Sequence, residues 1–478
     1  MSVDTDNAAF QDALNLIQYT RQSVFLTGKA GTGKSTFLRY VCEHTKKKYV
    51  VLAPTGIAAI NAGGSTMHSF FKLPFYPLLP DDPNLSLQRG RIHEFFKYTK
   101  PHRKLLEQIE LIIIDEISMV RADIIDAIDR ILRVYSHNLR EPFGGKQLLL
   151  VGDVFQLEPV VKNDEREILN RFYPTPYFFS ARVFGQIDLV SIELQKVYRQ
   201  TDPVFVGVLD HIRTNTAGAA DLQLLNTRYG SQIEESEADM YITLATRRDT
   251  VDSINEKKLA ELPGESITFE GVIEGDFPES SLPTSQELVL KPGAQIIFIK
   301  NDFDRRWVNG TIGVIAGIDE EEETIYVITD DGKECDVKRD SWRNIRYRYN
   351  EKTKEIEEEV LGSFTQYPIR LAWAITVHKS QGLTFSRVVI DFTGGVFAGG
   401  QAYVALSRCT SLDGIQLKKP INRADIFVRP EIVNFAGRFN NRQAIDKALK
   451  QAQADVQYAA AARAFNKGDM EECLEQFF

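Results

Sequence analysis

Residues 28–36 read GKAGTGKST and have the spacing of a phosphate-binding loop, G-x-x-x-x-G-K-[ST]. An apolar run precedes the stretch and a helical pattern follows it, which is the strand–loop–helix setting that this loop requires. In such a loop, backbone N–H groups turn toward phosphate oxygens, the lysine reaches the β- and γ-phosphates, and the hydroxyl holds Mg²⁺. The stretch therefore predicts that the chain binds a nucleoside triphosphate. The residues expected to form this site are Gly28, Ala30, Gly31, Thr32, Gly33, Lys34, Ser35 and Thr36.

An acidic pair, Asp115 and Glu116, directly follows the apolar run 111–114. A run of leucine and β-branched residues is typical of a strand buried on both faces. The carboxyl end of such a strand is where open α/β sheets bind their ligands. We expect Asp115 to hold Mg²⁺ together with Ser35, and Glu116 to polarise the attacking water. Considered alone, the two carboxylates would also fit a surface pair that caps the next helix. Considered together with the phosphate-binding loop, they indicate hydrolysis of the nucleotide.

The elements that must position these groups follow an alternating α/β pattern. It predicts a helix over 8–24, strands over 24–26, 49–52, 111–114 and 147–151, and a helix that ends near His44. This is the pattern of a doubly wound core that ends near residue 190. Residues 66–100 interrupt it with proline, aromatic and basic residues, so we expect an insertion there.

A second α/β unit starts near Ser191, with strands expected over 241–245, over 388–391 and near Ile415. Residues 296–362 differ, because short β runs alternate with turn signals such as Asn309-Gly310 and Asp331-Gly332. They predict a small β-barrel inserted in the second core. The sequence after about residue 429 is helical in pattern, and we expect a cap packed on the second core rather than a partner-binding arm.

The bulk properties leave the choice of partner open. The 478 residues carry 57 basic and 66 acidic side chains, and a net charge of −9 taken alone points away from nucleic acid. Basic clusters at 46–48, 97–104 and 343–348 nevertheless allow a locally basic groove. Four cysteines without C-x-x-C spacing argue against a disulfide framework or a zinc site. We expect no signal peptide or membrane span, and a cytoplasmic protein.

Further segments carry polar groups at expected strand ends. They are APTGIAAINAGGSTMHSFF (53–71), LLLVGDVFQLEPV (148–160), VYRQ (197–200), ITVHKSQGLTF (375–385) and YVALSRC (403–409). Gln156 is placed to contact the γ-phosphate, and Arg199 and Arg408 are candidate finger residues from the second core. Alone, each arginine would more readily be interpreted as part of a surface salt bridge. Thr55, Thr66 and His68 would suit contacts to a nucleic-acid backbone.

This ordered series resembles the superfamily-one helicases. Residues 140–160, REPFGGKQLLLVGDVFQLEPV, resemble still more closely the signature of the Pif family of DNA helicases, in its bacterial, minimal form. The segments ATRRDTVDSIN and VNGTIG are also similar to that family. The resemblance extends from about residue 8 to 420. Glu158 departs from it, since a second proline is usual there, and we expect little effect on the chemistry.

The resemblance implies an α/β fold in which two RecA-like cores sandwich ATP and Mg²⁺. Gln11 fits the adenine-reading glutamine, with Gln18 on the same helix as its rival. The ATP-site motifs are matched by Lys34, Ser35, Asp115, Glu116, Gln156, Arg199, Gln381, Gly382 and Arg408. Contacts to single-stranded DNA are implied for Thr55, Gly56, Thr66, His68, Thr246, Arg247, Asn255, Thr376 and His378.

The implied domains are core 1A (1–65 and 101–190), a strand-separating wedge 1B (66–100), core 2A (191–295 and 363–430), an SH3-like module 2B (296–362) and a helical tail (431–478). Such enzymes move 5′ to 3′ on single-stranded DNA, act on tailed or forked duplex and often on G-quadruplexes, and we expect a monomer. Three alternatives stay open: an ATPase that translocates without unwinding, an RNA helicase, and a phosphate-loop scaffold that binds proteins.

Overall fold

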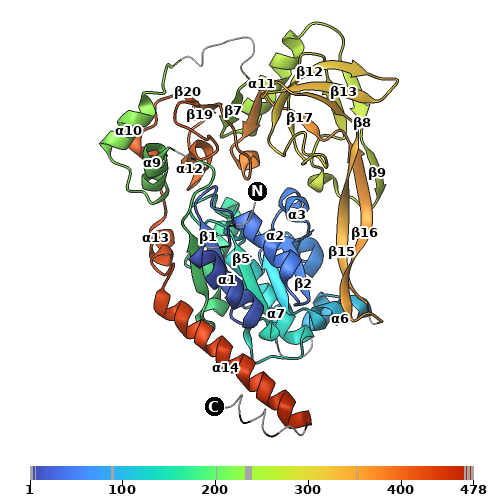
Figure 1. The fold of residues 1–478 in the computed structure, drawn as a ribbon, viewed down its shortest axis with the longest axis vertical. Helices are drawn as coiled ribbons and strands as arrows, with labels where there is room; N and C mark the ends of the chain where they lie inside the picture. The colour runs from blue at the N-terminus through green and yellow to red at the C-terminus, as the bar shows by residue number, and fades with distance from the viewer. Residues whose placement is uncertain are drawn as a thin grey trace.

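The computed structural model describes residues 4–5, 7–87, 91–200, 202–231, 240–350, 352–467, 470 and 474. Two parallel sheets lie one above the other in Figure 1, and an antiparallel β module lies beside the upper sheet. The chain thus has the predicted α/β fold. Among the described residues, no helix is long and apolar enough to cross a membrane.

The lower sheet belongs to the first core and contains six parallel strands in the order β3-β2-β4-β5-β1-β6. Its central strands are fully buried, as their leucine- and isoleucine-rich sequences predict. The strands are β1 (Val24–Gly28), β2 (Tyr49–Ala53), β3 (Ser65–Thr66), β4 (Leu111–Ile114), β5 (Gln147–Val151) and β6 (Val190–Leu194). All three active-site segments predicted for this core therefore leave the sheet at its carboxyl edge.

Helices of the first core cover both faces of this sheet (Figure 1). The first of them ends at Tyr19 and not near residue 24, because the Thr20 backbone is extended and its hydroxyl bonds the Leu16 carbonyl at 2.6 Å. The helices are α1 (Ala8–Tyr19), α2 (Lys34–His44), α3 (Gly56–Ala62), α4 (Met67–Phe71), α5 (Arg91–Phe95), α6 (Lys100–Gln108), α7 (Ala122–Tyr135) and α8 (Asn163–Leu169).

The upper sheet belongs to the second core and contains four parallel strands in the order β18-β7-β19-β20. They are β7 (Ile242–Ala245), β18 (Ala374–Thr376), β19 (Val388–Asp391) and β20 (Ile415–Leu417), so the three predicted strands are confirmed. The surrounding helices are α9 (Pro203–Arg213), α10 (Ala219–Asn226), α11 (Arg248–Glu261) and α12 (Gln401–Leu406). Each half of the chain thus supplies one parallel sheet. We use the word cleft for the interface between the two cores at which residues 28–36, Arg199 and Arg408 meet.

The antiparallel module extends beyond residues 296–362 on both sides. Its five-stranded sheet has the order β14-β13-β12-β11-β17, and a three-stranded sheet has the order β15-β16-β9. The bounds of the domains stay a prediction; the strands themselves are β8 (Ile267–Glu270), β9 (Val272–Gly275), β10 (Glu287–Leu290), β11 (Gln295–Phe298), β12 (Ile312–Asp319), β13 (Thr324–Thr329), β14 (Glu334–Val337), β15 (Asp340–Asn350), β16 (Glu355–Gln366) and β17 (Ile369–Leu371).

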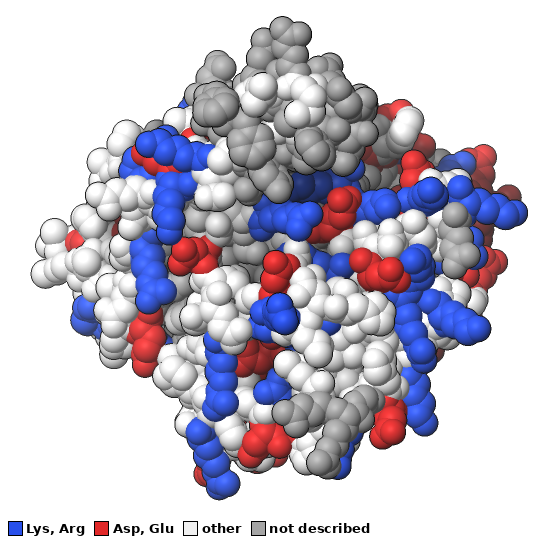
Figure 2. Space-filling model, turned by 90° about the horizontal axis from the view of Figure 1, so that it is seen from below, with Lys and Arg blue, Asp and Glu red and all other residues white. Residues whose placement is uncertain are grey.

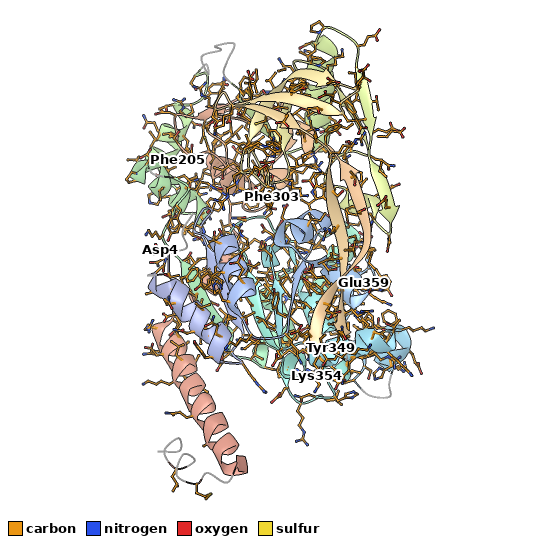
Figure 3. All side chains as sticks on the ribbon, turned by 45° about the vertical axis from the view of Figure 1, so that its right-hand side comes forward. Asp4, Phe205, Phe303, Tyr349, Lys354 and Glu359 are labelled. Carbon is orange, nitrogen blue, oxygen red and sulfur yellow. The ribbon has the colours of Figure 1, made fainter. Side chains whose placement is uncertain are left out.

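The hairpin of β15 and β16 descends from the module along the first core to α6 (Figures 1 and 3). Its inner face carries Ile345, Tyr347 and Tyr349, which join the first core's hydrophobic cluster. The Tyr347 hydroxyl accepts a hydrogen bond from the Val51 backbone N–H at 3.3 Å, beside the short edge strand β3. The hairpin therefore ties the module to the first core.

The C-terminal helices α13 (Pro430–Ala436) and α14 (Arg442–Lys467) pack on the first core, so the expectation that they cap the second core is wrong. Phe435 stacks on Phe179 with ring centres 4.3 Å apart. Ile445 and Ala448 join the cluster that lies between α1 and the sheet. The reason is apolar complementarity: the inner faces of α13 and α14 match two hydrophobic surfaces that the first core exposes.

Candidate functional site

The phosphate loop connects β1 to α2 and faces the second half of the chain. Gly31 and Gly33 have φ of +79° and +89°, a conformation that L side chains rarely adopt. A Cβ placed on Gly31 would lie 2.4 Å from the Cβ of Arg199. Glycine is thus required here, because the backbone of the loop lies directly against an arginine that leads into the second core.

Lys34 begins α2 and points back into the loop. Its ammonium donates to the carbonyl oxygens of Gly28 at 2.7 Å and Lys29 at 3.1 Å. Burial lowers the pKa of Lys34, and the charges of Asp153 and Glu116 oppose that shift. Ser35, the next residue, is exposed at the start of the helix. The loop therefore offers a half-buried cation and, on the next residue, an exposed hydroxyl.

The acidic pair lies at the carboxyl end of β4, as predicted. Asp115 accepts a hydrogen bond from the Glu116 backbone N–H at 2.9 Å, and burial raises its pKa. Glu116 has a left-handed backbone, with φ of +51°. Burial, together with the charge of Asp115, raises the pKa of Glu116 to about 7. A carboxylate poised near neutrality beside a phosphate loop is suited to accept a proton from water.

Two arginines from beyond the first core reach the same cleft. Arg408 is only 2% exposed, and its guanidinium donates to carbonyl oxygens of Val404, Ser380 and Leu383. Burial and the nearby charge of Arg199 lower the pKa of Arg408 to about 9. Among the described residues, neither arginine has an ion-pair partner. A buried and a half-buried cation, bonded within the described residues to neutral oxygens, form a suitable site for an anion such as a triphosphate.

Gln156 lies between the two cores. Its side-chain oxygen accepts a hydrogen bond from the Gln381 amide at 3.4 Å, which joins a loop of the first core to a segment of the second. Gly400 lies so close to this loop that a Cβ would be 2.3 Å from the Gln156 carbonyl oxygen. Gly382, with φ of +80°, follows Gln381 in the turn after η7 (His378–Ser380). The predicted γ-phosphate residue is thus held from the opposite core.

The adenine-reading candidates lie on α1. The Gln11 side chain donates to the Thr5 carbonyl at 2.7 Å, in the segment that leads into α1. Tyr198 connects that segment to the phosphate loop, because its hydroxyl donates to Asp4 at 2.8 Å and its backbone N–H to the Gly31 carbonyl at 2.9 Å. Gln18 lies about two turns further along the helix. Of the two, Gln11 is on the side of the loop.

Three of the threonines predicted to contact DNA cap the element that follows them. Thr55, Thr66 and Thr376 accept hydrogen bonds from backbone N–H groups three residues on, at 3.1–3.2 Å, at the starts of α3, α4 and η7. Thr66 and Thr376 are the last residues of β3 and β18, and Thr55 follows the end of β2, so all three lie at the carboxyl edge of their sheet. They therefore shape the backbone along that edge, with side chains that are already engaged.

The other predicted DNA contacts differ in how free they are. The Asn255 amide both donates to and accepts from the Ala374 backbone at 2.9 Å, which fixes β18 against α11. Arg247 is exposed and donates to the Gly394 carbonyl at 3.2 Å. The buried Thr246 hydroxyl has no hydrogen-bond partner within the described residues.

His68 is stacked face to face on Phe75, with ring centres 5.0 Å apart, and Phe75 is 84% exposed. Burial lowers the pKa of both His68 and His378. Gly56 faces the module, where a Cβ would lie 2.4 Å from the Ser281 hydroxyl. An exposed aromatic stack in the predicted wedge is the kind of surface on which a base can stack.

Sequence reasoning missed several groups at the cleft. The hydroxyl of Tyr403 accepts a hydrogen bond from the Ala30 backbone N–H at 3.0 Å, so the second core directly touches the phosphate loop. Lys29 of that loop forms an ion pair with Asp210 on α9. Tyr403 opens the YVALSRC segment that contains Arg408, which was a usable signal. Nothing in the sequence around Asp210 indicates this ion pair, because its partner lies 181 positions away.

A cationic group in the second half was missed as well. Burial lowers the pKa of Arg370 on β17 to about 10. Burial also lowers the pKa of Lys379, and the charges of Arg370 and Arg248 contribute to that shift. Within the described residues, neither Arg370 nor Lys379 forms an ion pair. These cations lie beside Thr376 and His378 in the chain, where a phosphate backbone would meet them.

The basic cluster 343–348 is largely neutralised. Its second half, residues 346–348 on β15, lies directly opposite residues 357–359 on β16, and Arg346 and Arg348 form ion pairs with Glu359 and Glu357. Figure 2 shows basic and acidic side chains interspersed on the face that it presents. This part of the hairpin is therefore no basic groove.

The comparisons with known proteins agree with this geometry. Residues 4–207 match the family of PIF1-like helicases. The ATP-dependent DNA helicase Pif1 of Campylobacter jejuni is 34% identical, over 83% of this chain and 88% of its own length. The chain belongs to the PIF1-like helicases. The predicted family is thus confirmed, and its general activity is that of an ATP-dependent DNA helicase. The chain spans about 60% of the PIF1 of Emericella nidulans.

Solved structures of Bacteroides Pif1 have the same fold, with two RecA-like cores. The complex with ADP-AlF4 is 41% identical and has a TM-score of 0.83, over 91% of this chain and 97% of that one. The complex with single-stranded DNA is also 41% identical, but its TM-score is 0.65, over 93% of this chain and 99% of that one. At equal identity, the present arrangement is closer to the structure with nucleotide analogue alone.

Proposed function

We propose that this chain moves 5′ to 3′ along single-stranded DNA, unwinds tailed or forked duplex, and also acts on G-quadruplex DNA. The observation that carries the motor part of this proposal is the cleft between the two cores. The phosphate loop lies directly against Arg199, and Arg408 is buried nearby with no ion-pair partner among the described residues. The charge needed by a γ-phosphate in its transition state is thus divided between the two halves.

In the proposed mechanism, ATP is the substrate that joins the two cores. Lys34 binds the β- and γ-phosphates, Ser35 and Asp115 hold Mg²⁺, and Gln11 reads adenine. Mg²⁺ neutralises charge on the phosphate oxygens. Glu116 accepts a proton from the attacking water, and its raised pKa suits that role. Arg199 and Arg408 stabilise the transition state, and Gln156 with Gln381 signals the state of the cleft to the second core.

The DNA strand is proposed to follow the carboxyl edges of both sheets. Thr55, Gly56, Thr66 and His68 lie along the first sheet; Thr246, Arg247, Asn255, Thr376 and His378 lie along the second. Phosphate contacts would dominate affinity, so binding should depend strongly on salt. Phe75 and Phe303, 84% and 98% exposed, would add stacking; Figure 3 shows Phe303 on the module's side of the first core.

The difference between the two TM-scores supports a change of arrangement when the strand binds. A further similar structure, 40% identical, concerns DNA unwinding at forked double-stranded DNA by two coordinating Pif1 helicases. We propose that one copy of this chain is sufficient to translocate, and a titration of unwinding rate against protein concentration tests that. The described cysteines, Cys42, Cys335 and Cys409, are free thiols. This supports a reducing compartment, in keeping with the cytoplasmic location that we propose.

The deciding experiment compares unwinding of one duplex carrying either a 5′ or a 3′ single-stranded tail. Unwinding only from the 5′ tail would support the proposal, whereas unwinding only from the 3′ tail would overturn the direction. Stimulation of ATP hydrolysis by DNA without unwinding would favour the translocase. Stronger stimulation by RNA of the same sequence would favour the RNA helicase. Removal of the exposed tip of residues 66–100 should reduce unwinding and spare DNA-stimulated hydrolysis.

A further inference from the structure

Residues 153–158, which we name the sensor loop, leave β5 and carry Gln156 into the cleft. The loop is embedded in the second half of the chain. Leu157 is fully buried in the second core's hydrophobic cluster, and Gly400 packs on the carbonyl oxygens of Phe155 and Gln156. The position of Gln156 therefore depends on the contacts that fix the two ends of this loop.

The first end of the loop is held by Arg213, the last residue of α9. Its guanidinium donates to both carboxylate oxygens of Asp153 at 3.1 and 3.2 Å, and it forms an ion pair with Glu193 on β6 at 2.8 Å. The Arg213 side chain is 4% exposed and lies over the Phe155 ring at 4.4 Å. Burial opposes the charge of Arg213, but Asp153 outweighs it and raises the pKa of Arg213.

The second end of the loop is held by Arg429, the residue before α13. Its Nε donates to Glu158 at 2.8 Å and its Nη2 at 3.4 Å, and the Tyr177 hydroxyl donates to the same carboxylate at 3.1 Å. The Glu158 side chain is only 10% exposed. The link joins the loop after β5 to the segment that leads into α13, 271 positions further along the chain.

We propose that Arg213 and Arg429 are positioning residues that hold Gln156 at the γ-phosphate, and that the Glu158–Arg429 link couples the C-terminal helices to ATP hydrolysis. The inference rests on the proposed function. Arg213 ends α9 of the second core, whereas Arg429 leads into α13, which packs on the first core. A shift between the cores thus moves the Asp153 end of the loop relative to the Glu158 end, and Gln156 lies between these ends. The C-terminal helices bear on that motion, because they hold the end that stays with the first core.

Arg429→Gln and Glu158→Gln test the link, since each removes the charge pair and keeps most of the volume. We expect each to lower the kcat of DNA-stimulated ATP hydrolysis by about fivefold, with the KM for ATP within about twofold, because misplacement of a catalytic group affects turnover more than binding. The double variant should lose no more than either single one, since both break one interaction. The exchange Glu158→Arg with Arg429→Glu should restore part of the loss.

Arg133→Gln is the matched control. Arg133 forms a buried ion pair with Asp129 on α7, and its other hydrogen bonds go to Leu139, Arg140 and Gln186, outside the sensor loop. This variant should therefore lower the melting temperature and leave kcat unchanged. If both link variants keep kcat within twofold of the parent, or if the control loses as much kcat, the inference is overturned. Should Arg429→Gln fail to fold, Glu158→Gln, which removes the same charge pair from the other side, decides by the same criterion. Parent protein without DNA-stimulated hydrolysis would instead refute the proposed function.

Discussion

The nucleotide cleft and the edge predicted to bind DNA use their polar side chains in opposite ways. In the cleft, Lys34 donates to loop carbonyls, the half-buried Arg199 and the buried Arg408 are bonded to neutral oxygens, and within the described residues none of the three forms an ion pair. Along the edge predicted to bind DNA, Thr55 and Asn255 are already hydrogen-bonded to the backbone of Ala58 and of Ala374. The cleft therefore holds positive charges that an anion can pair with. At the edge, in contrast, the polar side chains fix the conformation of the backbone.

This difference implies different sensitivities. A cation that is buried without an ion pair has been desolvated in advance, so its interaction with a phosphate is strong. A threonine bonded to the backbone contributes to DNA binding only through the N–H groups that it orients. Contacts to DNA phosphates are numerous and individually weak. Single substitutions should thus be severe in the cleft and mild along the edge.

The largest expected effect is that of Arg199→Gln. Loss of an arginine finger should lower kcat by about 10³-fold. Arg228→Gln is the control, because Arg228 also belongs to the second half but bonds Asp413 and the Ile415 carbonyl away from the cleft. Steady-state ATPase assays with saturating DNA measure both. If Arg199→Gln lowered kcat by less than about tenfold, Arg199 would not stabilise the transition state as proposed.

Glu116→Gln should lower kcat by about 10²- to 10³-fold and preserve ATP binding, because the amide keeps the shape but cannot accept the proton. Equilibrium binding of a fluorescent ATP analogue and single-turnover hydrolysis separate the two quantities. Hydrolysis near the parent rate would show that another group activates the water.

The pH profile should show the raised pKa of Glu116, about 7. Burial favours the neutral acid, and only the carboxylate accepts a proton, so activity should fall as pH drops below 7. The limiting slope of kcat/KM is about tenfold per pH unit. The profile of kcat/KM for ATP between pH 5.5 and 9 checks this, and a flat profile from 6 to 8 would contradict it.

The same contrast explains what the sequence predicted. The residues of the loop, the acidic pair and the strands β5 and β19 follow from local patterns, since periodicity and spacing are local properties. The ion pairs of Arg213 and Arg429 do not, because their partners lie 60 and 271 positions away. The C-terminal helices were placed on the wrong core for the same reason: an amphipathic face does not specify which apolar surface it will meet.

Along the DNA edge, Thr376→Val should weaken single-stranded DNA binding by only about threefold, since it removes one helix cap of about 1 kcal/mol at most from the backbone that meets the strand. Arg370→Gln should weaken binding more and also reduce the slope of log affinity against log salt by about one, because it removes a cation. Fluorescence anisotropy at several salt concentrations measures both. If both variants had the same salt slope, the proposal that Thr376 fixes the backbone while Arg370 pairs with a phosphate would be wrong.

The smallest effect is expected on the hairpin. Arg346→Gln removes a cation that is already paired with Glu359 on an exposed face, so DNA affinity should change by less than about twofold and the salt slope should stay the same. Glu359→Gln is the sharper partner experiment, since it releases Arg346 without adding a charge elsewhere. If Glu359→Gln increased DNA affinity and steepened the salt slope, the hairpin would lie within reach of the strand. The pairing of its charges would then weaken binding there, and the DNA edge would extend beyond the carboxyl ends of the two sheets.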